Sequence, residues 1–275
     1  MLAAALISFR EGLEAALIVA IVIGYLVKIG QRGQVRVAWA GVIAAVLASA
    51  LVALGITTVG AELEGRAEQI FEGTTMFLAV GVLTWMIFWM RSQARFMKSS
   101  LEKEVFTAAT SGQVLALFSV AFLVVFREGV ETALFLSASA FVADGGGTLI
   151  GAILGLGIAA AMGWFIYAST VRLNVRMFFN VTSVLLLFFA AGLLAHGVHE
   201  FQEAGLLPMT IEHVWDTNHI LDESSAFGEI MKALFGYNGN PSLLEVISYV
   251  TYWVLALVGV RWWVERRATP MAARA

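Results

Sequence analysis

The sequence contains Phe-Arg-Glu-Gly-Leu-Glu at residues 9–14 and Phe-Arg-Glu-Gly-Val-Glu at residues 126–131, and each copy interrupts a long apolar run. Inside a bilayer, one Arg or acidic side chain costs about 2.5–3.5 kcal/mol on insertion scales. Six such charges without compensation would cost on the order of 15–20 kcal/mol, which exceeds the net stability of about 5–15 kcal/mol of a typical fold. The charges must therefore neutralise one another, take up protons or hold a cation. The two copies predict a membrane transporter whose site lies at these residues.

The composition separates this chain from ordinary soluble proteins. Of its 275 residues, 60% are hydrophobic and 13% are charged, and the mean hydropathy is +0.84. A soluble domain has about 25% charged residues, so we expect this chain to lie in a lipid bilayer. It has no cysteine, which excludes disulfides, thiolate metal sites and cysteine nucleophiles. It also lacks a Walker motif and a glycine-rich dinucleotide loop, and nothing in the sequence predicts ATP-driven transport or binding to nucleic acid.

Seven apolar runs are each long enough to span a membrane as a helix. A span needs about 20 residues, because the hydrocarbon core is about 30 Å thick and a helix rises about 1.5 Å per residue. The sequence therefore predicts an all-α integral membrane protein with seven transmembrane helices. The predicted spans are residues 2–29, 35–59, 67–91, 112–141, 147–170, 176–199 and 243–264.

Lysine and arginine gather in alternate loops, and this asymmetry predicts the orientation of the chain. Cytoplasmic loops are enriched in Lys and Arg, so the N-terminus is expected outside and the C-terminus in the cytoplasm. Tryptophans such as Trp89 then lie near the inner ends of the helices, as interfacial anchors do. The basic residues are Lys28, Arg32 and Arg36 after the first span, Arg91, Arg95, Lys98 and Lys103 after the third, Arg172 and Arg176 after the fifth, and Arg261, Arg266, Arg267 and Arg274 in the tail.

The two motif copies lie 117 residues apart, on the first and fourth spans. These spans are expected to cross the membrane in opposite directions, so each copy belongs to a unit of three helices with opposite orientation. Such 3+3 inverted repeats occur in many secondary transporters, which bind their substrate near the bilayer midplane. The predicted architecture is a single transmembrane domain over residues 1–275, divided into repeat one (1–110), repeat two (111–199), an extracytoplasmic loop (200–242) and one extra C-terminal helix (243–264).

Four glutamates of the two motifs are predicted to form a metal-binding cage near the midplane: Glu11, Glu14, Glu128 and Glu131. The two glutamates of each motif are three residues apart, so they share one helix face. Their oxygens suit a hard or borderline cation. With Arg10 and Arg127, four negative and two positive charges sum to −2, which a divalent cation or bound protons would cancel. We expect both arginines to orient and partly neutralise the glutamates rather than to contact the metal.

The motif charges also have a purely structural interpretation, in which each Arg–Glu set pins helices together through ion pairs. Charges inside a membrane are functional by default, and here they occur twice at equivalent depth, so the metal-binding interpretation is favoured. The two interpretations differ in one test. If the glutamates hold the transported ion, replacing them with alanine abolishes uptake and leaves membrane insertion intact.

Further acidic and imidazole groups lie toward the outer side and could capture cations. Glu72, at the start of the third span, is assigned to the metal path. Two glutamates before it fit a solvated helix start equally well, and residues 196–200 could receive a metal or could form a polar helix end that reaches water. A short amphipathic helix is expected at about 225–235. The outer candidates are Glu64, Glu68, His196, His199, Glu200, Asp222 and Glu223.

Two other functions could use the same carboxylates. An oxygen cage discriminates poorly among divalent ions, so a permease for another ion such as manganese is one alternative. A membrane di-metal oxidase is the other, but such sites draw on Glu-x-x-His pairs in a bundle core. All four histidines here lie at the outer end of the sixth span or in the outer loop. The sequence therefore predicts a transporter rather than an enzyme, and no tightly bound cofactor.

The paired Arg-Glu-Gly-x-Glu motifs resemble those of the iron permease family, which includes fungal high-affinity iron permeases and bacterial ferrous-uptake permeases. The resemblance extends to residues 71–73, to Trp85, Trp89 and Met90, and to the segments 215–225 and 236–244. It implies import of Fe²⁺ or Fe³⁺ across the cytoplasmic membrane, with the four motif glutamates binding the ion. It also implies an extracytoplasmic accessory protein that changes the redox state of iron or delivers it. The short tail lacks the acidic extension of the fungal members, which favours a bacterial protein of the inner membrane.

Overall fold

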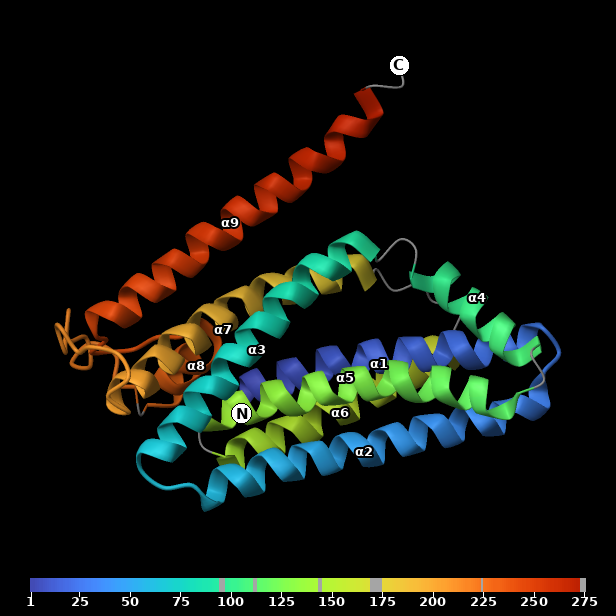
Figure 1. The fold of residues 1–275 in the computed structure, drawn as a ribbon, viewed down its shortest axis with the longest axis horizontal. Coiled ribbons are helices and arrows are strands. Elements are labelled where there is room, and N and C mark those ends of the chain that lie inside the picture. Colours follow the sequence, from blue (N-terminus) through green and yellow to red (C-terminus); the bar gives the residue numbers. More distant parts are fainter. Residues whose placement is uncertain (94–96, 111–112, 143–144, 169–174, 224, 273–275) are drawn as a thin grey trace. The chain divides into compact units, whose positions relative to one another are not determined.

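The computed structural model describes residues 1–93, 97–110, 113–142, 145–168, 175–223 and 225–272, and these residues form helices and loops without strands (Figure 1). The all-helical prediction is thus confirmed. Some residues of the topology prediction, among them Arg95, Arg172 and Arg274, lie outside the described residues. The helices are α1 Leu2–Lys28, α2 Val35–Glu62, α3 Arg66–Gln93, α4 Met97–Thr110, α5 Val114–Val142, α6 Gly145–Ala168, α7 Val175–Glu203, α8 Ala226–Phe235 and α9 Leu243–Ala272, with a 3-10 turn, η1, at Arg32–Gln34.

Seven helices of 24 to 30 residues in the described part of the chain coincide with the predicted spans. α1 and α5 each carry the three charges of a motif, and the apolar part of α9 is shorter, Leu243–Gly259. The chain therefore has the helices of a membrane protein, while the number of spans and their orientation stay predictions. Among the described residues, four stretches are long and apolar enough to cross a membrane: Arg32–Glu62, Arg66–Met90, Gly146–Phe165 and Asn180–Glu203.

The helices divide into two compact units. The first unit comprises residues 1–64 and 89–186, and it contains α1, α2, α4, α5, α6, the end of α3 and the start of α7. The second unit comprises residues 65–88 and 187–275, with most of α3, the later part of α7, α8 and α9. All six motif charges lie in the first unit. The division of the sequence into two repeats is not tested by these units and stays a prediction.

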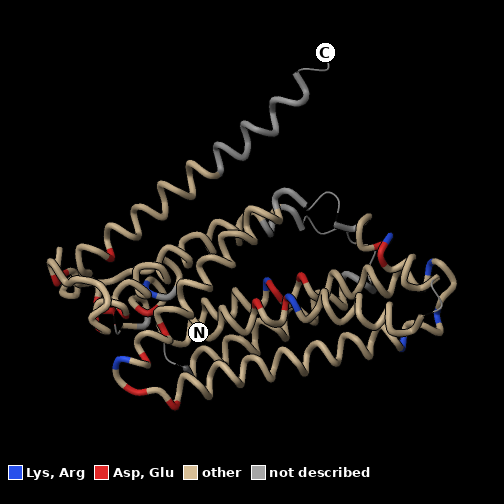
Figure 2. Tube along the Cα trace, viewed as in Figure 1, with Lys and Arg blue, Asp and Glu red and all other residues tan. Residues whose placement is uncertain are grey.

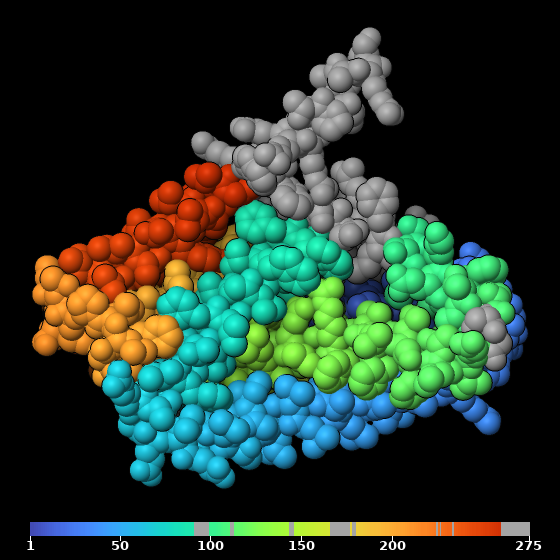
Figure 3. All heavy atoms as spheres, in the orientation of Figure 1, coloured from blue at the N-terminus to red at the C-terminus, as the bar shows by residue number. Residues whose placement is uncertain are grey.

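Two helix pairs make up most of the first unit: α1 packs chiefly against α6, and α2 chiefly against α5. In the space-filling view α2 and α5 lie side by side (Figure 3). Small residues set the register of the α1/α6 pair. A Cβ at Gly151 would lie 2.2 Å from the carbonyl oxygen of Met1, and a Cβ at Gly163 would lie 2.7 Å from the Cβ of Ala16. Because the contacts advance in the same direction along both helices, α1 and α6 are parallel.

The α2/α5 pair repeats this geometry. A Cβ at Gly41 would lie 2.6 Å from the carbonyl oxygen of Phe118, and further along both helices Ser49 meets Gly129, so this pair is parallel as well. The contact of Gly151 with the carbonyl oxygen of Met1 thus corresponds to the contact of Gly41 with the carbonyl oxygen of Phe118. Residues 1 and 118 are 117 positions apart, as the motif copies are. Equivalent backbone atoms of the two motif helices therefore meet equivalent glycines of α6 and α2.

The segment after α3 corrects the sequence prediction. It was expected to be a loop, but residues 97–110 form α4. Leu101, Val105, Ala108 and Ala109 are spaced as one face of a helix, and this face is buried against α1 and α5. The helix has only 14 residues and its other faces are polar, so the apolar runs that indicate spans do not indicate α4.

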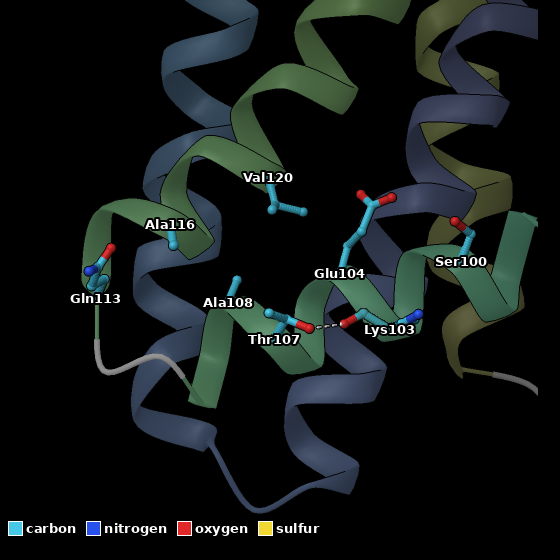
Figure 4. A pocket seen from close by; sticks show the side chains of 8 residues that line it. All are labelled: Ser100, Lys103, Glu104, Thr107, Ala108, Gln113, Ala116 and Val120. Atoms are coloured by element: carbon cyan, nitrogen blue, oxygen red, sulfur yellow. Dashed lines mark hydrogen bonds between the residues drawn. The ribbon is translucent and has the colours of Figure 1, made fainter.

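A cavity of about 560 Å³ lies between α4 and α5 (Figure 4). Its polar lining includes Lys103, Glu104, Thr107 and Gln113, and the Thr107 hydroxyl donates a hydrogen bond of 2.9 Å to the carbonyl of Lys103. The residues that line this cavity include none of the predicted metal ligands. It is thus separate from the predicted cage.

In the second unit, Glu245 ties residues 200–242 to the long helices. Its side chain is 2% exposed. Its carboxylate accepts hydrogen bonds from the backbone N–H of Ser242 at 3.1 Å and from the side chain of Asn238 at 2.7 Å, and it lies 3.0 Å from Nδ1 of His199. Since the N–H of Glu245 lies 3.3 Å from the Ser242 hydroxyl, the two residues form a capping box at the start of α9.

The short helix expected at about 225–235 is confirmed as α8, Ala226–Phe235. Ser225 caps its N-terminus by accepting a hydrogen bond of 3.0 Å from the N–H of Gly228. Gly236 ends it in the left-handed conformation, with φ of 67°, which favours glycine. Gly236 also lies against α7, where a Cβ at Gly192 would be 2.5 Å from its Cα. The close approach places α8 against α7.

Candidate metal centre

The two motifs lie near the middle of α1 and α5, which contact each other. Figure 2 shows the group of acidic and basic positions midway along the two helices, apart from the charges at the helix ends. Arg10 and the four motif glutamates are buried, with exposed fractions of 0 to 7%. The structure thus places five of the six motif charges in the interior of the first unit. Arg127 is the exception, because 33% of its side chain is exposed.

Each motif glycine lets a further helix approach the charged residues. A Cβ at Gly12 would lie 3.0 Å from the Cβ of Ala159 on α6, and a Cβ at Gly129 would lie 2.6 Å from the Cβ of Ser49 on α2. Real Cβ atoms essentially never lie closer than 3.0 Å to another atom. A larger residue between the two glutamates would therefore push α6 or α2 away at the level of the site.

Three carboxylates from both motifs converge. Glu11, Glu128 and Glu131 each offer one oxygen, and these three oxygens lie within 4.8 Å of one another. Among the described residues, Oε2 of each of these glutamates is buried and has no hydrogen-bond partner. Three carboxylates so close in a low-dielectric interior repel one another strongly. The group, which we call the carboxylate trio, needs an additional positive charge or protons.

The carboxylate trio has the dimensions of a cation site. An ion held by oxygens at about 2.0–2.6 Å has opposite ligands about 4–5 Å apart, and the oxygens of Glu11, Glu128 and Glu131 lie no more than 4.8 Å from one another, close enough to share one ion. Donors that are all oxygen suit hard and borderline divalent ions. The ligands come from two helices, so binding of one ion would join α1 to α5.

Both motif arginines contact glutamates of their own helix. Arg10 forms an ion pair with Glu11 and lies 2.8 Å from a carboxylate oxygen of Glu14. Arg127 donates from Nε to Glu131 at 2.9 Å. Glu14 lies outside the carboxylate trio, although it pairs with its motif arginine as Glu131 does and the sequence gives it the same standing as the other three glutamates.

The outer candidates of the third span lie in the described residues at the start of α3 and just before it. Glu64 and Glu68 are exposed, as a solvated helix start requires. Glu72 is half-buried, and its charged neighbours are Glu68 and Glu200. This gathering of carboxylates is compatible with attraction of cations, but it holds no group of three ligand atoms as close as the carboxylate trio among the described residues.

The histidines of α7 are engaged with carboxylates. Nε2 of His196 lies 3.9 Å from Glu200, while His199 has Nε2 at 3.2 Å from Glu203 and Nδ1 at 3.0 Å from Glu245. Glu245 was not predicted to take part in any site. The Ser-x-x-Glu pattern that begins α9 could have indicated its capping role, but its contact with His199 depends on the fold.

The last two outer candidates lie before α8. Glu223 accepts a hydrogen bond from the backbone N–H of Gly239 and lies 3.6 Å from Nζ of Lys232, so its carboxylate holds the loop together. Asp222 is exposed, and its backbone carbonyl accepts from the N–H and the hydroxyl of Ser225. Within the described residues, neither carboxylate joins a group of three possible metal ligands.

Comparison with known proteins identifies the family. The sequence model of the iron permease FTR1 family matches residues 1–270 of the chain. The chain belongs to this family. It is 41% identical over 257 residues to a protein named ferrous iron permease EfeU from Escherichia coli O157:H7. The matched region covers 92% of each of the two chains. A relative with the same name from Yersinia pestis is 40% identical over 257 residues, with 92% of this chain and 90% of the relative covered.

One relative of this chain carries a name that describes it as inactive. The protein of Escherichia coli strain K12 is named putative inactive ferrous iron permease EfeU and is 41% identical over 257 residues. Identity at this level therefore shows the family, and the function must be argued from the site. No solved structure matches the chain.

Two residues of this permease-family chain that sequence reasoning did not assign to the site lie against the motif arginines. Trp89 was predicted to be an interfacial anchor, but its ring centroid lies 4.5 Å from the guanidinium carbon of Arg127. Met90 accepts a hydrogen bond of 2.9 Å from Arg10 through its sulfur. Both residues lie on the last turns of α3, far in sequence from the motifs, so no local spacing could have revealed these contacts.

Proposed function

We propose that this chain imports iron across the cytoplasmic membrane through a carboxylate site that the two motifs build near the bilayer midplane. The observation that carries the proposal is the carboxylate trio of Glu11, Glu128 and Glu131, whose buried oxygens lie within 4.8 Å of one another. Family membership supplies the cargo, because relatives at 40 and 41% identity are named ferrous iron permeases. Iron is the transported substrate, and the proposal includes no tightly bound cofactor.

The charge of the site favours a divalent ion. Four glutamates and two arginines sum to −2, and a ferrous ion brings that sum to zero in a region where net charge is expensive. A permease for manganese would use the same oxygen donors, since such donors discriminate weakly among divalent ions. Iron is preferred over manganese because of the relatives' names, and the experiment below includes manganese as a competitor.

The packing of the first unit supports the 3+3 inverted repeat with seven spans. α1 and α5 are equivalent in the predicted repeat, as are α2 and α6. If each helix is replaced by its equivalent in the other repeat, the α1/α6 pair becomes the α5/α2 pair. Both pairs are parallel, and their glycine contacts correspond. Under this arrangement the two motifs approach each other from opposite directions, which suits a site shared by both halves.

The orientation is proposed with the N-terminus outside and the C-terminus in the cytoplasm of a bacterial cell, in the inner membrane. In the first unit, η1 and α4 lie together, since Gln34 donates a side-chain hydrogen bond of 3.1 Å to the carbonyl of Ala109. The basic residues Lys28, Arg32 and Lys103 belong to this same end, which supports its assignment to the inside. On the outside, Glu72 and its neighbours are proposed to attract the ion, and an accessory protein is proposed to deliver it or set its valence.

A transporter explains the donor set better than an enzyme does. The carboxylate trio contains no histidine, whereas a di-iron oxidase in a helix bundle combines glutamates with Glu-x-x-His pairs. The family that the chain belongs to is one of permeases. The site is therefore proposed to bind and release iron without changing it chemically.

Uptake of ⁵⁵Fe²⁺ into proteoliposomes that contain only the full chain tests the proposal. Wild type is expected to show saturable uptake that excess Mn²⁺ inhibits, because oxygen donors discriminate weakly among divalent ions, and Glu11→Gln, Glu128→Gln and Glu131→Gln are expected to abolish uptake. Glu104→Gln, at an exposed glutamate of α4 that is none of the candidate ligands, is the matched control and should retain uptake. Undiminished uptake by the Glu128→Gln/Glu131→Gln double variant would show that iron does not pass through this site.

A further inference from the structure

The two motifs have matching sequences, but their arginines have different surroundings. Arg10 is fully buried and is surrounded by Glu11, by Glu14 at 2.8 Å and by the sulfur of Met90 at 2.9 Å. It bridges both glutamates of its own motif. With no exposed surface and partners on several sides, this guanidinium has little room to change its position.

Arg127 is held in another way. It donates from Nε to Glu131 at 2.9 Å, and its guanidinium carbon lies 4.5 Å from the centre of the Trp89 ring. One third of its side chain is exposed. The guanidinium also interacts electrostatically with Glu128, so it lies near two members of the carboxylate trio.

Although Arg127 lies close to Glu128 and Glu131, one oxygen of each of these carboxylates has no hydrogen-bond partner among the described residues. A guanidinium has five N–H donors and commonly binds a carboxylate through two of them. Within the described residues, however, Oε2 of Glu128 and Oε2 of Glu131 are buried without a hydrogen-bond partner. A charged donor that bonded these oxygens would gain about 1.5–3 kcal/mol per bond. The ring of Trp89, 4.5 Å from the guanidinium carbon, is placed to favour an orientation of the guanidinium that leaves these two oxygens unbonded.

We propose that Trp89 is a positioning residue that holds Arg127 on the face of its ring and so keeps the guanidinium, already bonded to Oε1 of Glu131, from turning toward Oε2 of Glu128 and Glu131, which leaves these two oxygens for the cation. Without the ring, the guanidinium would turn toward Glu128 and Glu131 and occupy the place of the ion. Arg127 would then compete with iron for the same oxygens. This inference rests on the proposed function, because it requires that the trio bind a cation.

The expected size of the effect follows from the contact that is lost. A cation–π contact is worth about 0.5–2 kcal/mol, depending on how far it is desolvated. In the open arrangement Arg127 lies on the ring, and in the blocked arrangement it bonds the trio's oxygens. If the energy of the ring contact separates these two arrangements, its loss lowers the population of the open one and lowers the apparent affinity for Fe²⁺ in proportion. Trp89→Ala is therefore expected to weaken Fe²⁺ binding by about two- to thirtyfold. Trp89→Phe, which keeps a ring face, should restore most of the affinity.

Arg127→Gln has the opposite expected effect. It removes both a positive charge beside the trio and the group that would block it, so Fe²⁺ should bind at least about tenfold more tightly than to wild type. In this background the ring has no guanidinium to hold. Adding Trp89→Ala to Arg127→Gln should therefore leave the affinity unchanged, and this dependence separates a positioning role from a general structural one.

The test is an anaerobic titration of Fe²⁺ into the purified full chain in detergent, for wild type, Trp89→Ala, Arg127→Gln and the double variant. Trp39→Ala, at a tryptophan of α2 that is 46% exposed, controls for removal of an indole. The inference is supported if Trp89→Ala weakens binding only when Arg127 is present. It is overturned if Trp89→Ala leaves the affinity unchanged, or weakens it equally in the Arg127→Gln background.

A further variant separates failure of this inference from failure of the proposed function. Glu128→Gln/Glu131→Gln removes two ligands of the trio and does not involve the ring. If this variant binds Fe²⁺ as wild type does, the site itself is wrong and the inference fails with it. If it loses Fe²⁺ while the effects of Trp89→Ala and Arg127→Gln are additive, the site stands and only the role of Trp89 is refuted.

Discussion

Replacing Gly129 with alanine is expected to force α2 away from α5 at the level of the site. The new Cβ would lie 2.1 Å from the hydroxyl oxygen of Ser49 and 2.6 Å from its Cβ. The hydroxyl can rotate, but the Cβ of Ser49 is fixed to the backbone of α2. Ordinary contacts begin at 3.4 Å, so the helices must separate by the difference between 3.4 and 2.6, or about 0.8 Å. Overfilling a packed interior in this way costs about 1–3 kcal/mol.

Thermal unfolding of the purified full chain in detergent, combined with Fe²⁺ titration, measures this effect. Gly129→Ala should lower the unfolding temperature and weaken Fe²⁺ binding, because α5 carries two ligands of the trio. Gly157→Ala is the matched control, since a Cβ there has no atom within 4 Å among the described residues. As alanine favours a helix over glycine by about 1 kcal/mol, this control should be neutral or stabilising.

A compensating substitution makes the steric argument specific. Ser49→Gly removes the atoms that a Cβ at position 129 would meet, at the cost of about 1 kcal/mol for a glycine within a helix. Gly129→Ala/Ser49→Gly should therefore be about as stable as Ser49→Gly alone. If Gly129→Ala is as stable and binds Fe²⁺ as well as wild type, or if Ser49→Gly gives no rescue, the close approach of α2 to α5 is refuted.

Three further outcomes follow from contacts described above. Glu245→Ala should cost about 2–3 kcal/mol, because buried donors lose their acceptor, and limited proteolysis should then cut residues 200–242 faster; an unchanged cleavage rate would contradict the role of this carboxylate. Leu101→Ala, on the buried face of α4, should lower stability by about 2–3 kcal/mol, whereas Phe106→Ala on the exposed face should change the unfolding temperature little. Glu72→Gln should raise KM for iron uptake and leave the maximal rate intact if Glu72 captures the ion, and a lower maximal rate at unchanged KM would argue against capture.

The positions of the long helices and of the site helices could be predicted from sequence because the signals are local. An apolar run of about 20 residues indicates a helix wherever it occurs, and two glutamates three residues apart share a helix face in any context. The duplicated motif also indicates which helices carry the site. α4 escaped notice because only Leu101, Val105, Ala108 and Ala109 mark its buried face, and such a short stripe is weak beside the long apolar runs.

The differences among the four motif glutamates could not be predicted. Glu14 and Glu131 occupy equivalent positions in the two motifs and each pairs with the arginine four residues before it, yet only Glu131 belongs to the carboxylate trio. The surroundings of the two motif arginines also differ, because the last turns of α3 place Trp89 against Arg127 and Met90 against Arg10. A repeat in the sequence predicts equivalent backbones, whereas the contacts that a third helix makes with each motif arginine depend on the fold.

The pairing of α1 with α6 bears on how the protein is made. α1 leaves the ribosome and enters the membrane long before α6 is synthesised, so it must pass this interval without its main neighbour. Until α3 and α5 follow, its charges have neither Met90 nor the second motif beside them. Arg10 can offset one of the two negative charges of its motif within a single helix, because its ion pairs join residues one and four positions apart. The order of charges in the motif thus lowers the cost of inserting α1 into the lipid bilayer. The same carboxylates can form a binding site only after α5, in the second half of the chain, has been synthesised.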